Sequence, residues 1–210
     1  MNEQDDPRTL VKFAYDEFAA KAPHVSRQTE TPDQIVLSHL LERLGPESRV
    51  LDAGCGNGLP VARRLVDAGH HVTGIDISEG QLSQARKNVP EASFQRMDME
   101  QPVLPAESFD AIVSYYAILH VPRSRQQNVL ENFQRMLKPG GYAFLCLADS
   151  DCEGYVSELG PVKEMYFSHF SAGQYMEMIA KTAFTVLWSD IVPDSTDPKA
   201  RHLFVLLKNR

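Results

Sequence analysis

Short apolar segments alternate with amphipathic segments along most of this chain, and this alternation restricts the fold more than any other feature of the sequence. Segments typical of strands lie at 49–53, 71–76, 93–97, 109–114, 142–147, 185–188 and 202–207, and helical patterns lie at 31–44, 60–68, 123–137 and after residues 78 and 171. Strands that alternate with helices favour parallel β-α-β units, and nearly continuous apolar strands favour a sheet buried on both faces. The sequence therefore predicts a doubly wound α/β fold. Its ligand would bind at the carboxyl ends of the strands, just after residues 51, 75, 97 and 113.

Composition and charge limit the class of protein. The chain has 210 residues, 43% of them hydrophobic, which suits one domain over residues 1–210 with a sizeable core. No apolar run approaches the ~18 residues that a membrane helix needs, and the polar start is unlike a signal peptide. Cys55, Cys146 and Cys152 suit neither a disulfide framework nor a metal site, and a net charge of −7 disfavours nucleic-acid binding through a broad basic face. We therefore expect a cytoplasmic protein with no metal, no nucleic-acid partner and no membrane partner.

The segment Asp52-Ala53-Gly54-Cys55-Gly56-Asn57-Gly58 places three alternate glycines between a strand and a helix. Glycine tolerates a positive φ and lets the backbone approach a ligand closely. Leu59 stands where the dinucleotide fingerprint Gly-x-Gly-x-x-Gly has its third glycine, so the turn departs from one that binds a pyrophosphate. Asp76 ends the second strand, where a carboxylate can accept hydrogen bonds from both hydroxyls of a ribose. The alternative for Asp76 is an acidic residue in a solvated loop.

Five features occur in order: Val50 to Gly58, Asp76, Met97 to Glu100, Phe109 to Val113, and Leu137 to Gly141. Together they resemble the class I S-adenosylmethionine-dependent methyltransferases, in particular small-molecule enzymes of the menaquinone-biosynthesis type. The resemblance is strongest over residues 48–148, which would form the cofactor-binding core. It implies a Rossmann-like, seven-stranded, mostly parallel sheet with helices on both faces and an antiparallel edge strand. It also implies S-adenosyl-L-methionine as cofactor and S-adenosyl-L-homocysteine as product.

The resemblance assigns the parts of the cofactor to positions in this sequence. Asp52 and the glycine turn would hold the methionyl part, Asp76 the ribose, and Asp98 the amino group of the adenine. Tyr15 lies in a stretch that resembles an N-terminal lid (residues 1–30), and a packing residue on a helix face is the alternative for it. The cofactor-binding residues predicted in this way are Tyr15, Asp52, Gly54, Cys55, Gly56, Asn57, Gly58, Asp76, Ile77, Asp98, Met99, Ser114 and Tyr115.

Two segments carry side chains suited to the methyl acceptor. His120, after the fourth strand, would remove a proton from the acceptor, because a histidine titrates near neutrality; alternatively it holds the shape of its loop by hydrogen bonds. Residues 149–175 resemble a substrate cap, for which ordinary packing on the sheet is the alternative. The predicted catalytic residues are His120, Tyr116 and His169, and the predicted substrate-binding residues are Tyr116, Tyr166, Phe167 and His169.

The resemblance thus implies a methyltransferase that acts on O, N, S or C of a small-molecule acceptor, as a monomer or homodimer. The small-molecule class rests on the lack of a basic tract. It rests also on Ser114-Tyr115-Tyr116-Ala117, which stands where amino-methylating relatives carry Asn-Pro-Pro-Tyr. Two alternatives stay open: a cyclase or decarboxylase that uses the bound sulfonium electrostatically, and a non-catalytic cofactor-binding subunit. A nicotinamide oxidoreductase is disfavoured by Leu59.

Overall fold

A seven-stranded sheet forms the centre of the molecule, seen in a computed structural model that describes residues 6–21, 31–194, 197 and 199–210. The strand order is β3-β2-β1-β4-β5-β9-β8, and the first five strands in this order run parallel. The strands are β1 (Arg49–Ala53), β2 (His71–Asp76), β3 (Ser93–Arg96), β4 (Phe109–Ser114), β5 (Leu137–Ala148), β8 (Thr185–Pro193) and β9 (Arg201–Lys208). The Rossmann-like α/β fold predicted from the sequence is therefore confirmed.

The antiparallel pairing predicted for one edge of the sheet involves the last two strands. β9 runs opposite to both of its neighbours, β5 and β8. Its apolar segment Leu203–Leu207 is buried because this strand lies between two others, whereas most side chains of the outermost strand β8 are exposed. The sequence pattern of each strand thus matches its position in the sheet.

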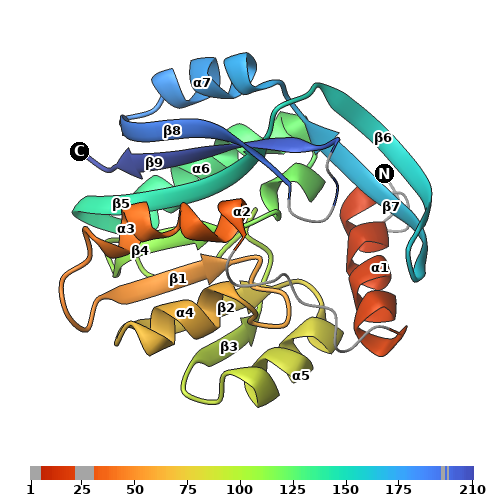
Figure 1. Cartoon of the computed structure of the whole chain (residues 1–210), viewed down its shortest axis with the longest axis horizontal. Coiled ribbons are helices and arrows are strands. Elements are labelled where there is room, and N and C mark those ends of the chain that lie inside the picture. Colours follow the sequence, from red (N-terminus) through yellow and green to blue (C-terminus); the bar gives the residue numbers. More distant parts are fainter. Residues whose placement is uncertain (1–5, 22–30, 195–196, 198) are drawn as a thin grey trace.

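Helices cover both faces of the sheet (Figure 1). One face packs against α2 (Pro32–Ile35), α3 (Ser38–Leu41), α4 (Val61–Asp67) and α5 (Glu79–Asn88). The other packs against α6 (Arg123–Met136) and α7 (Ala172–Ala180). No helix in the described part of the chain is long and apolar enough to cross a bilayer.

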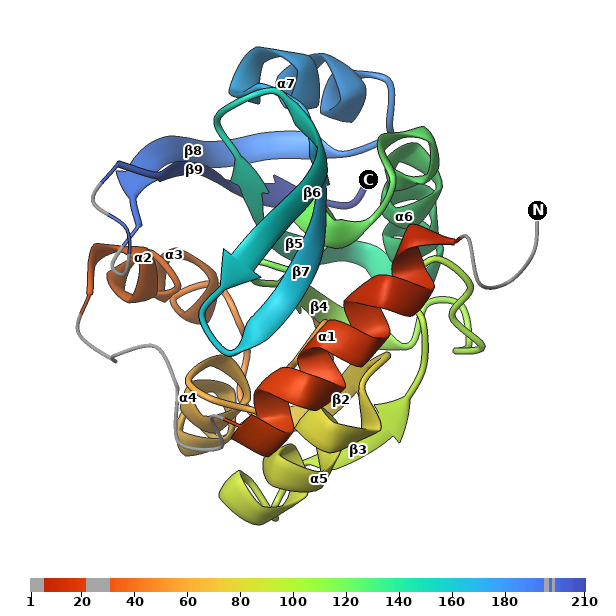
Figure 2. The same ribbon diagram turned by 90° about the vertical axis from the view of Figure 1, so that its right-hand side faces the viewer.

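Helix α1 (Pro7–Lys21) lies across the end of the sheet toward which β1 points (Figure 1). A hairpin of β6 (Cys152–Leu159) and β7 (Val162–His169) lies alongside it on the same side of the molecule, with β7 next to the helix (Figure 2). Val11 and Ala14 of the helix are buried against Val162, Met165 and Tyr166 of the hairpin. Each fully buried large apolar side chain contributes about 1.5–3 kcal/mol, so the helix and the hairpin stabilise each other.

Three local predictions were wrong. The helix expected over 31–44 is broken into α2 and α3, because the Ser38 hydroxyl donates to the Ile35 carbonyl (2.7 Å) and competes with the regular helical pattern. β5 begins at Leu137 rather than 142, because Gly140 and Gly141 pair with the Asn209 backbone at 3.1 and 2.8 Å. Within 149–175, the expected cap segment contains an antiparallel hairpin that the sequence reading did not predict.

Candidate functional site

A cavity of about 490 Å³ lies at the carboxyl ends of the central strands, between the glycine turn and α1. This is the end of the sheet where the sequence placed the ligand. Twelve predicted site residues line it: Tyr15, Asp52, Gly54, Cys55, Gly56, Asn57, Asp76, Ile77, Met99, Tyr115, Tyr116 and His120. The structure therefore brings together residues that are separated by up to 105 positions in the chain.

The glycine turn packs tightly between β2 and the segment after β4. Gly54 has φ +82°, and a Cβ atom there would lie 2.2 Å from the Ala117 Cβ, so no larger residue fits. The amides of Gly54 and Cys55 both donate to the Ile75 carbonyl, at 2.8 and 3.0 Å, which fixes the turn on β2. Gly58 also has a positive φ, and its amide donates to the Cys55 carbonyl; it shapes the turn from outside the cavity lining.

Two carboxyl groups face the cavity. Asp76 accepts hydrogen bonds from the amides of Gly56 and Ser78, each at 2.9 Å. The Asp52 carboxyl is buried, and its Oδ2 has no hydrogen-bond partner among the described residues. Burial, reinforced by the negative charge of Asp76, raises the pKa of Asp52 to about 7, and burial also raises the pKa of Asp76. This end of the cavity therefore favours a ligand that carries positive charge and N–H or O–H donors.

His120 is held between α1 and the hairpin. The Tyr166 carbonyl lies 2.8 Å from its Nδ1 and can only accept, so Nδ1 carries the proton. In the neutral ring, Nε2 then accepts from the Tyr15 hydroxyl at 2.9 Å. Burial is the main cause that lowers the pKa of His120 to about 4, so the ring is neutral at pH 7. Both ring nitrogens are engaged, which matches the hydrogen-bonded alternative from the sequence.

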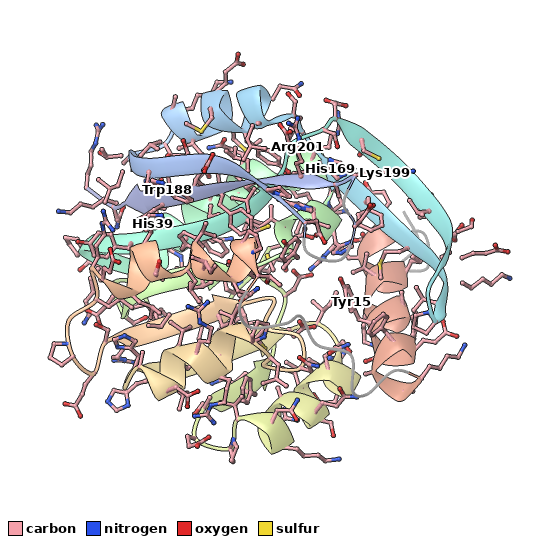
Figure 3. The ribbon with its side chains drawn as sticks, in the orientation of Figure 1. Tyr15, His39, His169, Trp188, Lys199 and Arg201 are labelled. Atoms are coloured by element: carbon pink, nitrogen blue, oxygen red, sulfur yellow. The ribbon has the colours of Figure 1, made fainter. Side chains whose placement is uncertain are left out.

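Tyr15 faces the interior from α1 (Figure 3). It shares one face of the helix with Arg8, Val11 and Phe18, at spacings of three, four and three residues, and all four line the cavity. The main-chain carbonyl of Tyr15 also accepts from the Gln81 side chain at 3.4 Å. Helix α1 therefore forms a wall of the cavity, as expected for a lid.

Asp98 and Ser114 do not line the cavity. The Asp98 carboxylate pairs with the Arg8 guanidinium, with Nη2 to Oδ1 at 2.9 Å. The Ser114 hydroxyl is buried and donates to the Ala53 carbonyl at 2.9 Å, so it links β4 to β1.

The three predicted substrate-binding residues of the hairpin also lie outside the cavity lining. The Tyr166 hydroxyl donates to Glu153 at 3.0 Å, and the Phe167 ring packs against His120 with ring centroids 4.7 Å apart. The His169 Nδ1 contacts the Ser150 carbonyl, and in Figure 3 His169 lies near Arg201 and well away from Tyr15. The hairpin thus supports α1 and His120 rather than lining the cavity itself.

Ten lining residues were missed from the sequence. They are Arg8, Val11, Phe18, Leu59, Pro60, Val61, Ile75, Gln81, Met97 and Ala117. The face of α1 that carries Arg8, Val11 and Phe18 beside Tyr15 could have been predicted to line the cavity. Its residues have helical spacing, and it contains one cation among apolar and aromatic side chains. Pro60 and Val61 follow closely after the glycine turn, so their proximity to the ligand could also have been predicted from the sequence.

Comparison with known proteins identifies the domain that contains this cavity. Residues 50–141 match the family model described as a methyltransferase domain. Over these residues the chain is similar to methyltransferase domains. The matched residues run from β1 into β5 and include the glycine turn, Asp76 and His120. The family resemblance stated from the sequence is therefore confirmed.

Two curated relatives illustrate the sequence similarity. The chain is 34% identical over 134 residues to a malonyl-[acyl-carrier protein] O-methyltransferase of Enterobacter lignolyticus, covering 62% of this chain and 52% of the relative. It is 32% identical over 139 residues to the aklanonic acid methyltransferase DauC of a Streptomyces species, covering 62% of this chain and 61% of the relative. The chain thus spans only about half to three fifths of the length of these relatives.

Solved structures show the same fold. A magnesium protoporphyrin IX methyltransferase from Synechocystis with bound S-adenosylhomocysteine superposes with a TM-score of 0.74 at 15% identity, over 98% of this chain and all of that chain. A methyltransferase from Methanosarcina mazei gives a TM-score of 0.72 at 20% identity, over 81% of this chain and 96% of that chain. At these identities the likeness establishes the fold alone.

Proposed function

We propose that this protein transfers a methyl group from S-adenosylmethionine to a small-molecule acceptor. The observation that carries the proposal is the cavity at the end of the matched domain, with a glycine turn on one side and the Asp52 and Asp76 carboxyl groups on its wall. The cofactor carries an ammonium group, a sulfonium and two ribose hydroxyls. These groups supply positive charge for both carboxyl groups and a donor for Asp52 Oδ2, which has no hydrogen-bond partner among the described residues.

We propose one orientation of the cofactor in this cavity. Asp52, whose Oδ2 has no partner, would accept from the ammonium group, and the glycine turn would lie along the amino-acid part. Asp76 would accept from the ribose hydroxyls while its own position is held by two amides. Ile77, Met97 and Met99 would contact the adenine ring. When bound, the cofactor supplies an activated methyl group on sulfur, so the protein contributes mainly position and exclusion of water.

The acceptor would enter beside α1 and the glycine turn. Val11, Phe18, Leu59 and Tyr116 give this part of the cavity an apolar and aromatic wall, which favours an acceptor with an apolar body. Several relatives are described as O-methyltransferases, which makes an oxygen atom the favoured methyl acceptor. The Tyr15 oxygen, whose proton is donated to His120, would accept a hydrogen bond from the acceptor hydroxyl and orient it.

Binding and product analysis test the proposal. We expect S-adenosylhomocysteine to bind the purified chain in isothermal titration calorimetry. With S-adenosylmethionine and a panel of phenols, quinols, carboxylic acids, amines and thiols, we expect at least one product with the mass gain of a methylene unit. An inactive matched control is Asp76→Ala. No detectable binding of either cofactor form to the wild-type protein would refute the proposal.

The same experiment separates the two alternatives. One solved structure with a TM-score of 0.69 is described as a [4+2]-cyclase, so the fold alone does not fix the chemistry. A cyclase would convert its substrate without a change in mass. A non-catalytic subunit would bind S-adenosylhomocysteine and modify nothing until a partner is added.

We also propose a reducing, cytoplasmic location and a monomer or homodimer. Cys55, Cys146 and Cys152 form no disulfide in the described structure, which supports the reducing location. Sedimentation equilibrium with and without S-adenosylhomocysteine measures the oligomeric state, and a stable assembly larger than a dimer would contradict it.

A further inference from the structure

Arg8 is the charged residue through which α1 contacts the loop that follows β3. The residue is 8% exposed and lies in the cavity wall. Nη2 lies 2.9 Å from Asp98 Oδ1, Nε lies 3.4 Å from Asp98 Oδ2 and 2.8 Å from Glu100 Oε1, and Nη1 donates to the His120 carbonyl at 3.4 Å. Arg8 therefore ties the lid to the segments after both β3 and β4.

The Asp98 carboxylate depends on Arg8 for its orientation. Besides Arg8, the described structure gives it one further donor, the Glu100 amide at 3.0 Å from Oδ1. The side chain is 35% exposed, so solvent is available to it when the guanidinium is removed. A carboxylate has about four acceptor sites, and Oδ2 has only the long contact to Arg8, so Oδ2 retains capacity for a donor from a ligand.

A second arginine offers an internal comparison. Arg125 on α6 lies 3.3 Å from Glu100 Oε2 and 3.1 Å from Asp6 Oδ2. It belongs to the same network of charges, but it neither lines the cavity nor contacts Asp98 in the described structure. Loss of Arg125 would disturb the charge network without removing the support of Asp98.

We propose that Arg8 is a positioning residue for the nucleobase end of the cofactor, and this inference rests on the proposed function. Asp98 does not line the cavity itself but lies between two residues that do, Met97 and Met99. With α1 in place, the Arg8 guanidinium holds Asp98 beside the cavity, where it would accept a hydrogen bond from the exocyclic amino group of the adenine. The amino group of the adenine is therefore recognised only when α1 is closed over the cavity. A protein with the lid open binds adenosyl and inosyl ligands alike.

The test compares two ligands that differ at one position of the base. S-inosylhomocysteine carries a carbonyl where S-adenosylhomocysteine carries the amino group, so an acceptor replaces the exocyclic donor that would face Asp98. Calorimetry would give the ratio of their dissociation constants for the wild type, Arg8→Met, Arg8→Lys, Asp98→Asn and the control Arg125→Met. Circular dichroism and thermal unfolding verify that each variant is folded.

We expect the wild-type protein to prefer S-adenosylhomocysteine about tenfold or more, as a hydrogen bond to a charged acceptor would give. We expect Arg8→Met and Asp98→Asn to lose most of this preference, Arg8→Lys to keep part of it, and Arg125→Met to keep it. If Arg8→Met and Arg8→Lys weaken both ligands equally and keep the wild-type ratio, Arg8 has a structural role only and the inference is overturned. A wild-type ratio near one also overturns it while leaving the proposed function intact. Failure of the wild type to bind either ligand refutes the proposed function itself.

Discussion

Replacement of Asp52 by asparagine tests whether an unpaired carboxyl group in the cavity destabilises the protein in the absence of a ligand. Burial and the charge of Asp76 raise the pKa of Asp52 from 3.8 to about 7. A difference of about three pKa units corresponds to about 4 kcal/mol. The folded-state pKa lies above that of the unfolded state, so the wild-type protein loses this stability as the pH rises from about 4 to about 7. Asparagine has nearly the same shape and cannot ionise, so Asp52→Asn escapes this loss.

The measurement is urea unfolding of both ligand-free proteins between pH 4.5 and 8. We expect Asp52→Asn to gain stability relative to the wild type as the pH rises, by up to about 4 kcal/mol at pH 8. Groups that do not interact with Asp52 cancel in the difference between the two proteins, whereas Asp76, whose charge is coupled to Asp52, contributes to it. A difference that does not change with pH, or a wild type that becomes relatively more stable toward pH 8, would refute the reasoning about this site.

Three further predictions concern the same cavity. Asp76→Ala removes the acceptor for the ribose hydroxyls and should abolish S-adenosylhomocysteine binding; unchanged affinity in calorimetry would contradict the assignment. The binding of S-adenosylhomocysteine should release protons near pH 7, because its ammonium group stabilises the charged form of Asp52; equal binding enthalpies in buffers of different ionisation enthalpy would contradict this. The pKa of His120 falls from 6.5 to about 4, so the wild type should lose about 3 kcal/mol of stability as the pH falls through this range. His120→Gln should lack this loss, and an unchanged acid-side slope of its unfolding free energy would refute it.

Features that depend on neighbouring residues were predictable from the sequence. The central strands are continuous apolar segments because both faces of the sheet are buried. The turn at Gly54 could be predicted because three alternate glycines lie between a strand and a helix. The structure explains this glycine, since its positive φ and the nearby Ala117 leave room for no other residue. The twelve predicted residues that line the cavity were implied mainly by the family resemblance, in agreement with the rule that ligands bind at the carboxyl ends of parallel strands.

Features that depend on distant contacts were not predictable in this way. Arg8 meets Asp98 across 90 residues of sequence, and the pattern near each gives no sign of the other. The hairpin residues Tyr166 and His169 have the residue types of a substrate site, but Tyr166 is buried against α1 and His169 contacts its own segment. From residue type alone, residues that support α1 could not be distinguished from residues that contact the methyl acceptor.

The central claim is that the cavity holds the cofactor with its amino-acid part at the glycine turn and its ribose on Asp76. A crystal structure of the protein with S-adenosylhomocysteine tests this most directly. We expect the ammonium group within hydrogen-bond distance of Asp52 and both ribose hydroxyls at the Asp76 carboxylate. Density for the ligand at another place, or an unoccupied cavity in crystals grown at a saturating ligand concentration, would contradict it.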